Sequence, residues 1–376
     1  MMFMFFLRAA LKTALVSMAF CALPASASGN VIVIGQAIDL SGPNASIGRD
    51  YVAGIKTCFD MMNANGGING RRIQYLARDD HGQPDIAARL VADLIELDHA
   101  EYLLGGVGDE SVRAVVRSAA FRNSSYLLFA PLAAGNYAIR DRVLFWRPGY
   151  QQEVRHILRH FGKLGMKNVA VAYQETASNA DAYKNLNAEL TAHRMTLSAT
   201  VRIDADGASV AQTAERLVAA KPDLVLVIAD TINTALFLKN YRQHGGQAFV
   251  AGTSLINLDT LRELAGTQAI EWTVFSQVVP DPGAGTSVLQ MEHLNMMRKY
   301  RDEAVSSLTL EGFAAAKALA KAIQQAKMPG RALHEFMEKN GVLDLGGLTA
   351  TASGDRNYLS NYLDIALYRK GSGLRF

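Results

Sequence analysis

Short runs of β-branched and apolar residues alternate with longer amphipathic segments along nearly the whole chain from Asn30 onward. The run Val31–Ile38 predicts a strand, and the segment 46–65 that follows places Tyr51, Ile55 and Phe59 on one face of a predicted helix. Alternation of strands with helices is typical of parallel sheets whose strands are connected by helical crossovers. The sequence therefore predicts an α/β fold.

The alternation is interrupted at two places, residues 139–149 (IRDRVLFWRPG) and Pro280–Pro282. We interpret each interruption as a crossing between two α/β lobes. The predicted division assigns 28–148 and 277–328 to an N-terminal lobe, and 149–276 and 329–376 to a C-terminal lobe. Because the chain crosses more than once, we expect a hinge rather than a flexible tether between the lobes.

The N-terminus has the features of an export signal. Two basic residues precede the apolar stretch Thr13–Leu23, which is shorter than the ~20 residues that span a bilayer. Ala25 and Ala27 match the small residues that signal peptidase requires. We therefore expect residues 1–27 to be removed as a signal peptide and the mature protein to be periplasmic.

Composition excludes several classes of protein. The chain has 38 Lys and Arg against 35 Asp and Glu, without a basic block, which argues against a nucleic-acid binder. No apolar run in it is long enough for a membrane span. Two cysteines cannot form a disulfide scaffold. Cys58 falls on the apolar face of the first predicted helix, so we expect it in the core.

The sequence also lacks the local motifs of common enzymes. It has no phosphate-binding loop, no G-x-S-x-G motif, and Gly106–Gly108 lacks the third glycine of a dinucleotide site. His156 and His160 have the spacing of a metal pair, but Arg155 and Arg159 beside them would repel a cation. We expect no catalysis, no cofactor and no metal.

Six segments, in this order, carry a family resemblance. They are LSGPNASIG (40–48), MNANGGINGRRIQYLARDD (62–80), YLLGGVGDESVRAV (102–115), LFAPLAAGN (128–136), VLFWRPG (143–149) and KNVAVAY (167–173). Together they resemble the type I periplasmic binding proteins of the leucine/isoleucine/valine-binding class. The resemblance implies two Rossmann-like lobes, joined by three strands, that close on a small ligand in a cleft. It also implies delivery of the ligand to the permease subunits of an ABC importer, and we expect a monomer.

In open α/β sheets, ligands bind beyond the carboxyl ends of the strands, near helix N-termini. The loops predicted at these ends are rich in Gly, Ser, Asn and Ala. The predicted ligand-binding residues of the first lobe are Ser41, Ser46, Asp109, Ser111, Ala133, Ala134 and Asn136. Those of the second lobe are Ser178, Asn179, Asp230, Ser254 and Asn257.

These loops depart from the pattern of the family's amino-acid binders. Those proteins hold the ligand carboxylate with Ser and Thr where this chain has Asp109 and Ala134, and the ammonium with an acid where it has Thr253–Ser254. A ligand carboxylate beside Asp109 would meet a like charge. We therefore expect a solute other than an ordinary α-amino acid. It would be a cation or polyol if Asp109 and Asp230 face the cleft, or an apolar ligand held by leucines of the loops.

Other interpretations stay open. Asp109 begins a predicted helix, where a carboxylate is stabilised by unpaired N–H groups whatever the function. The whole protein could instead be a sensory module that docks on a membrane receptor or kinase, a binder of branched-chain or other amino acids with altered contacts, or an exported enzyme.

Overall fold

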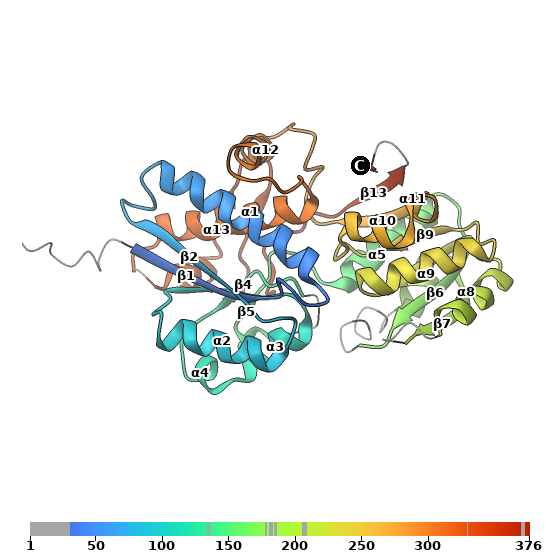
Figure 1. Ribbon diagram of the computed structural model, residues 1–376, viewed down its shortest axis with the longest axis horizontal. Helices are drawn as coiled ribbons and strands as arrows, with labels where there is room; N and C mark the ends of the chain where they lie inside the picture. Colours follow the sequence, from blue (N-terminus) through green and yellow to red (C-terminus); the bar gives the residue numbers. More distant parts are fainter. Residues whose placement is uncertain are drawn as a thin grey trace, which may run out of the picture.

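The protein is described from a computed structural model that covers residues 31–376 except 134, 136, 177–178, 180–182, 184–185, 205–208, 329 and 370–372. The chain forms two α/β lobes that lie side by side along the long axis of the molecule (Figure 1). The two-lobe α/β prediction is thereby confirmed. The predicted signal peptide, residues 1–27, and the predicted site residues Ala134, Asn136 and Ser178 lie outside the described residues.

The first lobe is built on a parallel five-stranded sheet of order β2-β1-β3-β4-β5. Its strands are β1 (Val31–Ile38), β2 (Arg72–Asp79), β3 (Tyr102–Leu104), β4 (Leu128–Phe129) and β5 (Val143–Leu144). One face is covered by α1 (Ala45–Ala64), α12 (Val288–Tyr300) and α13 (Ser307–Gln325), and the other by α2 (Pro84–Glu96), α3 (Asp109–Arg117) and α4 (Ala119–Arg122) (Figure 1).

The second lobe has a seven-stranded sheet of order β14-β13-β10-β9-β8-β6-β7. The parallel strands are β6 (Asn168–Gln174), β7 (Thr196–Ile203), β8 (Leu224–Ile228), β9 (Phe249–Gly252) and β10 (Thr273–Gln277), and β13 (Asp364–Arg369) and β14 (Gly373–Arg375) are antiparallel. The helices are α5 (Tyr150–Lys163), α7 (Leu186–Ala192), α8 (Val210–Ala219), α9 (Thr231–Gln243), α10 (Leu258–Ala265) and α11 (Thr267–Ile270).

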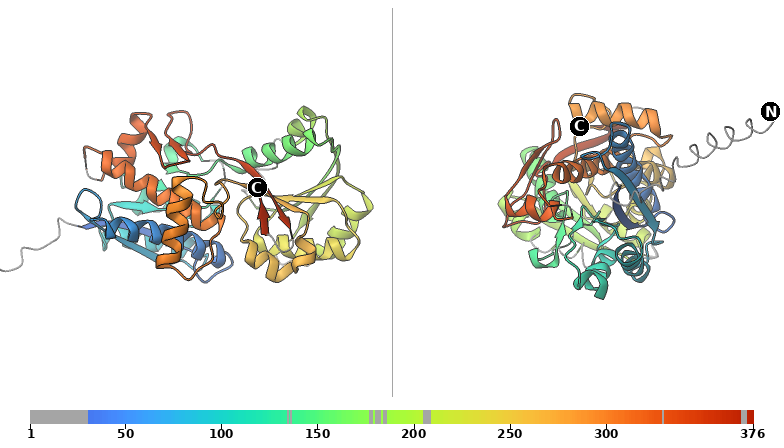
Figure 2. Two further views of the ribbon diagram at one scale, coloured as in Figure 1. Left: turned by 90° about the horizontal axis from the view of Figure 1, so that it is seen from above. Right: turned by 90° about the vertical axis from the view of Figure 1, so that its left-hand side faces the viewer.

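Three passages connect the lobes: after β5, after β10 and ahead of β13 (Figure 2). The first and third run side by side. The Phe145 N–H donates to the Asn357 carbonyl at 2.7 Å, and the Leu359 N–H donates to the Phe145 carbonyl at 3.0 Å. The Ser360 N–H donates to the carbonyl of buried Trp146 at 2.8 Å. Two passages are thus tied by backbone hydrogen bonds.

Two glycines let α1 and α13 pack backbone to backbone in the first lobe. A Cβ atom at Gly54 would lie 2.0 Å from the Thr309 carbonyl oxygen, and one at Gly312 would lie 2.2 Å from the Tyr51 carbonyl oxygen. Any larger residue at either position would force the helices apart. This contact fixes the start of α13, whose second turn carries Glu311.

The end of the chain departs from the predicted division. Helix α14 (Ala332–Glu338) and the hairpin β11 (Val342–Asp344) with β12 (Thr349–Thr351) contribute Phe336 and Leu343 to the same hydrophobic core as α1 and α13. Only β13 and β14 join the second sheet. The prediction placed all of 329–376 in the second lobe because apolar spacing identifies a buried face without identifying the core that buries it.

Two smaller predictions also differ. The alternation of strands and helices predicts one helix over residues 110–123, but the structure divides this segment at Ser118. The extended backbone of Ser118 ends α3, and its hydroxyl accepts from the Phe121 N–H at 3.3 Å to begin α4. The segment 139–149, predicted only as a crossing, contains β5, the fifth strand of the first sheet.

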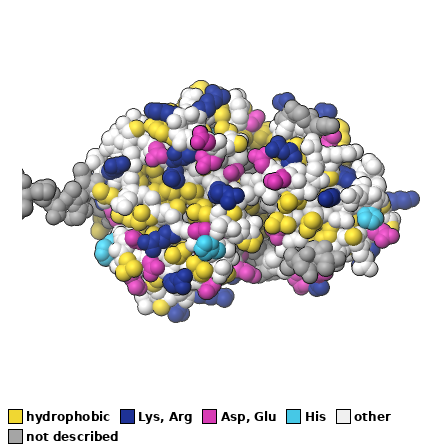
Figure 3. All heavy atoms as spheres, viewed as in Figure 1, with side chains coloured by type: hydrophobic (Ala, Val, Ile, Leu, Met, Phe, Trp, Pro, Cys, Tyr) yellow, Lys and Arg dark blue, Asp and Glu magenta, His cyan; other side chains and the backbone are white. Residues whose placement is uncertain are grey.

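Lys and Arg side chains are interspersed with Asp and Glu over both lobes on the face shown in Figure 3. Within the described residues, every helix is either too short or too polar to cross a bilayer.

Candidate functional site

Loops from the two lobes meet in front of the carboxyl end of β1, which runs toward the second lobe (Figure 1). Asn257, at the start of α10, donates through Nδ2 to the Ser46 carbonyl at 3.4 Å and to Asp50 Oδ2 at 3.3 Å. Its Oδ1 also caps α10 by accepting from the Thr260 N–H at 2.9 Å. The structure therefore brings two predicted site residues, Ser46 and Asn257, together from opposite lobes.

Asp109 has a structural role in the first lobe. Its side chain is only 8% exposed, and Oδ1 accepts from the Gly135 N–H at 2.8 Å and from the Tyr137 hydroxyl at 3.0 Å. A Cβ atom at position 135 would lie 2.4 Å from Asp109 Oδ1, so this approach requires glycine. The carboxylate holds the loop after β4 against the start of α3.

Asp230 has a similar role in the second lobe. It is the N-cap of α9: Oδ1 accepts from the Asn233 N–H at 2.8 Å and Oδ2 from the Asn233 side-chain amide at 3.0 Å. Gln174, the last residue of β6, links two site loops, because its side-chain oxygen accepts from the Asp230 N–H at 3.1 Å and its carbonyl accepts from Asn179 Nδ2 at 2.7 Å. Gln174 is not among the predicted ligand-binding residues, although its position at the end of a predicted strand could have identified it.

The remaining predicted residues differ in exposure. Ser41 is exposed, and its hydroxyl lies 2.6 Å from His81 Nδ1. Ser111 is 5% exposed in α3. Ala133 is 1% exposed and belongs to the apolar cluster between α2, α3 and the sheet.

A buried ionic network connects the lobes at the base of this region. Arg147, 1% exposed, lies between β5 and α5. Its Nε donates to Glu311 Oε1 at 2.8 Å, its Nη2 donates to Glu311 Oε2, and its Nη1 donates to Ser254 Oγ at 2.8 Å. A guanidinium holds a carboxylate well in such a two-bond arrangement. One side chain thus contacts the first lobe through Glu311 and the second lobe through Ser254.

Glu153, in the first turn of α5, adds a second carboxylate to this network. Its side chain is fully buried, and Oε2 accepts from the Ser254 N–H at 2.8 Å and from the Ser276 hydroxyl at 2.5 Å. Oε1 is buried without a hydrogen-bond partner. Burial raises the pKa of Glu153, while Arg147 opposes this shift. With two carboxylates and one guanidinium, the network carries an excess negative charge when both acids are ionised.

Tyr150, the first residue of α5, lies beside this network. Its phenol hydrogen-bonds Thr253 within the second lobe, and the charge of Asp109 in the first lobe acts on it. Burial, with the nearby Glu153 and Asp109 charges, raises the pKa of this phenol. The acid that the amino-acid binders carry at Thr253–Ser254 is absent from this loop, but the carboxylate of Glu153 reaches the same loop from α5.

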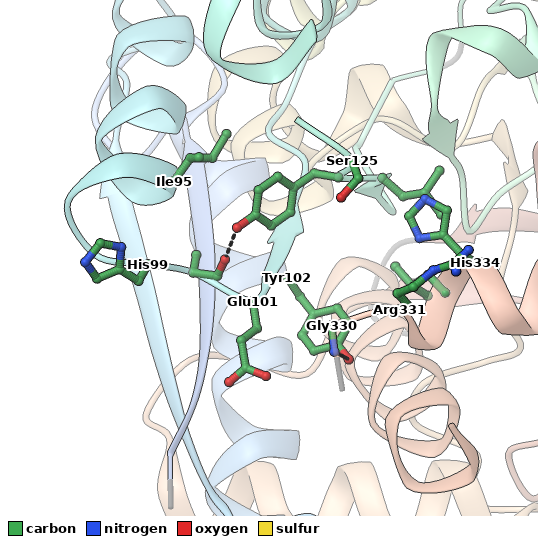
Figure 4. A pocket seen from close by; sticks show the side chains of 12 residues that line it. Ile95, His99, Glu101, Tyr102, Ser125, Gly330, Arg331 and His334 are labelled. Carbon is green, nitrogen blue, oxygen red and sulfur yellow. Dashed lines mark hydrogen bonds between the residues drawn. The ribbon is translucent and has the colours of Figure 1, made fainter. Parts of the chain in front are cut away.

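Two cavities lie near these elements. One of about 440 Å³ lies beside the passage after β10 and is lined from both lobes, by Asp50, Asn257 and Gln277 among others. Another of about 430 Å³ lies at the amino ends of β3 and β4 in the first lobe (Figure 4). There the Tyr126 hydroxyl donates to the Ala100 carbonyl at 2.5 Å, and the Tyr102 hydroxyl accepts from the Gly330 N–H at 3.2 Å. This second cavity is at the opposite end of the sheet from the predicted ligand loops.

Comparison with known proteins agrees with this architecture. A family model described as periplasmic binding protein matches residues 31–366. Among solved structures, the chain is similar to a substrate-binding periplasmic protein from Ralstonia solanacearum, with a TM-score of 0.82 and 28% identity over 91% of this chain and 99% of that one.

Two relatives match over shorter segments. An amino acid binding protein from Pseudomonas aeruginosa is 36% identical over 74 residues, which is 20% of each chain. The chemotactic signal transduction system substrate-binding protein BasB from Halobacterium salinarum is 29% identical over 95 residues, 25% of this chain and 23% of that protein. The matches therefore span only about a fifth to a quarter of these relatives.

Proposed function

Because the chain belongs to the periplasmic binding protein family, whose members bind small solutes, we propose that it captures one small organic solute between its lobes and delivers it to the permease of an ABC importer. The observation that carries this proposal is the meeting of loops from both lobes, where Asn257 reaches Ser46 and Asp50. Contacts across the cleft are what a closing two-lobed binder makes.

Closure works as a shift between open and closed populations. The Asn257 contacts are long, at 3.3 and 3.4 Å, and are easily broken when the lobes separate. A solute that touches both lobes binds the closed form better and therefore raises its population. The importer then recognises the closed form. In this proposal the three passages between the lobes bend as a hinge, and Arg147 with Glu311 keeps the base of the cleft together.

The solute we propose is not an ordinary α-amino acid. The loop position at which the amino-acid binders hold the ligand carboxylate carries Asp109, which is anchored by Gly135 and Tyr137 and cannot turn away without losing two hydrogen bonds. A carboxylate bound next to this acid would be repelled. The ligand contacts that we propose are the predicted loop residues. Their described hydroxyl and amide members are Ser41, Ser46, Ser111, Asn179, Ser254 and Asn257.

Mass spectrometry of compounds that co-purify with the protein, followed by a thermal-shift screen, tests the proposal. A bound solute at 100 times its Kd should add about 2.7 kcal/mol to the free energy of unfolding. Small-angle scattering should show a smaller radius of gyration with that solute. If no compound changes stability or shape, the binding function is wrong. Tight binding of leucine, isoleucine or valine would contradict only the proposed ligand class.

A sensory role is the second candidate, favoured by the similarity to a chemotactic substrate-binding protein. Deletion of the gene separates the two roles. Loss of uptake of the labelled solute supports transport, whereas unchanged uptake with loss of a chemotactic or kinase response supports sensing. An amino-acid ligand with altered contacts, as the name of the Pseudomonas aeruginosa relative suggests, is tested by the same screen.

A further inference from the structure

Three carboxylates converge at the carboxyl ends of β1 and β2. Asp39 follows β1, Asp79 is the last residue of β2, and Asp80 follows it. One oxygen from each lies within 4.8 Å of the other two. Asp39 and Asp80 are fully buried, and Asp79 is partly buried. Such crowding of acids in the interior is costly unless something balances the charge.

Backbone N–H groups account for only part of that balance. Asp39 accepts from the N–H groups of Gly42, at 2.6 Å, and of Asn44, at 2.8 Å. Asp79 Oδ1 accepts from the backbone of Leu40 and His81, both at 2.9 Å, and Asp80 Oδ1 accepts from the Gly82 N–H at 2.8 Å. Asp80 Oδ2 is buried and has no partner. One buried oxygen is therefore left without the hydrogen bond that its burial requires.

Positive charge near the three acids is scarce. His81 Nδ1 lies 3.1 Å from Asp79 Oδ2, but this imidazole is 52% exposed. In the part of the chain that the structure describes, neither Lys nor Arg forms an ion pair with any of the three acids. The cluster thus has a deficit of positive charge.

Glycines keep side chains out of the space beside the two buried acids. A Cβ atom at Gly106 would lie 3.4 Å from Asp80 Oδ2, and one at Gly82 would lie 2.7 Å from Asp39 Oδ2. The backbone carbonyl of Ala37 borders the space at Gly106, and the Pro43 side chain borders the space at Gly82. Carboxylate oxygens near backbone carbonyls are the ligands that hard divalent cations prefer.

We propose that Asp39, Asp79 and Asp80 form a site for an oxygen-preferring divalent cation, Ca²⁺ or Mg²⁺. The cation supplies the missing partner of Asp80 Oδ2 and the missing positive charge. It ties the loop after β1 to the end of β2, and so stiffens the entry to α1, whose first turn carries Ser46. The site adjoins the loop that carries Ser41, and its proposed role goes beyond solute binding.

The experiment uses the full mature chain dialysed against a chelator and then titrated with CaCl₂ or MgCl₂. We expect the melting temperature to rise with the logarithm of cation concentration, and calorimetry to show one site per chain. NaCl at equal ionic strength should not reproduce the rise. Asp80→Asn should weaken cation binding at least tenfold. Asp85→Asn, which removes an exposed acid five residues away in the first turn of α2, should leave it unchanged.

Two results would overturn the proposal. The first is the absence of any cation-dependent rise beyond that given by NaCl, and the second is an equal rise in wild type and Asp80→Asn. Folding of the variant is checked by its melting temperature in chelator, which should equal or exceed that of the wild type because a neutral amide relieves the repulsion by Asp39 and Asp79.

Discussion

The two glutamates around Arg147 should differ sharply in their effect on stability. Glu311 is the two-bond partner of a guanidinium that is 1% exposed. Removing one partner of a buried pair costs about 3–5 kcal/mol because the other charge stays buried without compensation. Glu311→Gln retains an amide oxygen for one hydrogen bond, and Glu153 stays nearby. We therefore expect a loss of about 3 kcal/mol in the free energy of unfolding, the lower end of that range.

Glu153→Gln should cost much less. The amide oxygen can still accept from the Ser254 N–H and the Ser276 hydroxyl, and Oε1 of the native carboxylate has no hydrogen bond to lose. The substitution also removes the excess negative charge. At pH 7 we expect a change within about 1 kcal/mol of the wild type, the net value of a single hydrogen bond.

The pH dependence gives an independent readout. Burial raises the pKa of Glu153, so the folded protein keeps this proton at pH values where the unfolded chain has lost it. The free energy of unfolding therefore falls as pH rises from the ordinary value of 4.5 through the raised native value. Glu153→Gln should lose this part of the pH dependence of the free energy of unfolding. Glu311→Gln leaves Glu153 in place and should therefore retain a pH dependence.

Urea denaturation followed by circular dichroism and by tryptophan fluorescence measures these changes, provided that the two transitions coincide. The matched pair controls for the loss of a carboxylate as such, since both substitutions are Glu→Gln in one network. Equal losses for the two variants, or a larger loss for Glu153→Gln, would refute the assignment of Glu311 as the principal partner of Arg147.

Three further predictions follow from the site. Asn257→Ala should lower the free energy of unfolding by about 1 kcal/mol because α10 loses its N-cap. It should also weaken solute binding and increase the radius of gyration measured by scattering. Ser287→Ala, which removes the N-cap of α12, should affect stability alone. Burial raises the pKa of Asp50 to about 6, so the free energy of unfolding should fall as pH rises from 4 to 6, and Asp50→Asn should flatten this slope in denaturation curves. Asp109→Ala removes the acceptor of two hydrogen bonds and should lower the free energy of unfolding by about 2 kcal/mol. Asp109→Asn should lower it less. Unchanged stability of the alanine variant would contradict the structural role of Asp109.

Strands were the most predictable part of the fold. From the sequence alone, the runs 31–38, 72–79 and 196–203 each predict a strand, and β1, β2 and β7 occupy these residues. The signal is local, since each run is bounded by polar or glycine-rich residues and one strand needs no information from its neighbours. Helix ends shifted by up to three residues because the last turn depends on caps that periodicity does not record.

The buried network could not be predicted in the same way. Arg147 and Glu311 are 164 residues apart, and they meet only because the chain returns to the first lobe after β10. A local signal did exist: Glu311 is the only acid in α13, a helix whose other residues from Leu308 to Ala320 are nearly all apolar or small. An acid placed in a buried helix requires a partner, but the sequence does not say which cation provides it.

The loop acids show how a capping residue can also restrict a ligand. Asp109 and Asp230 each accept hydrogen bonds from their own lobe, which accounts for their presence without any solute. The argument for a cationic or polyol ligand, which required these acids to be free to face the cleft, is therefore weakened. The argument against a ligand carboxylate is not, because repulsion depends on where the charge lies rather than on what anchors it. An acid anchored by Gly135 and Tyr137 is a fixed negative charge, and a fixed charge excludes a like charge more effectively than a mobile one does.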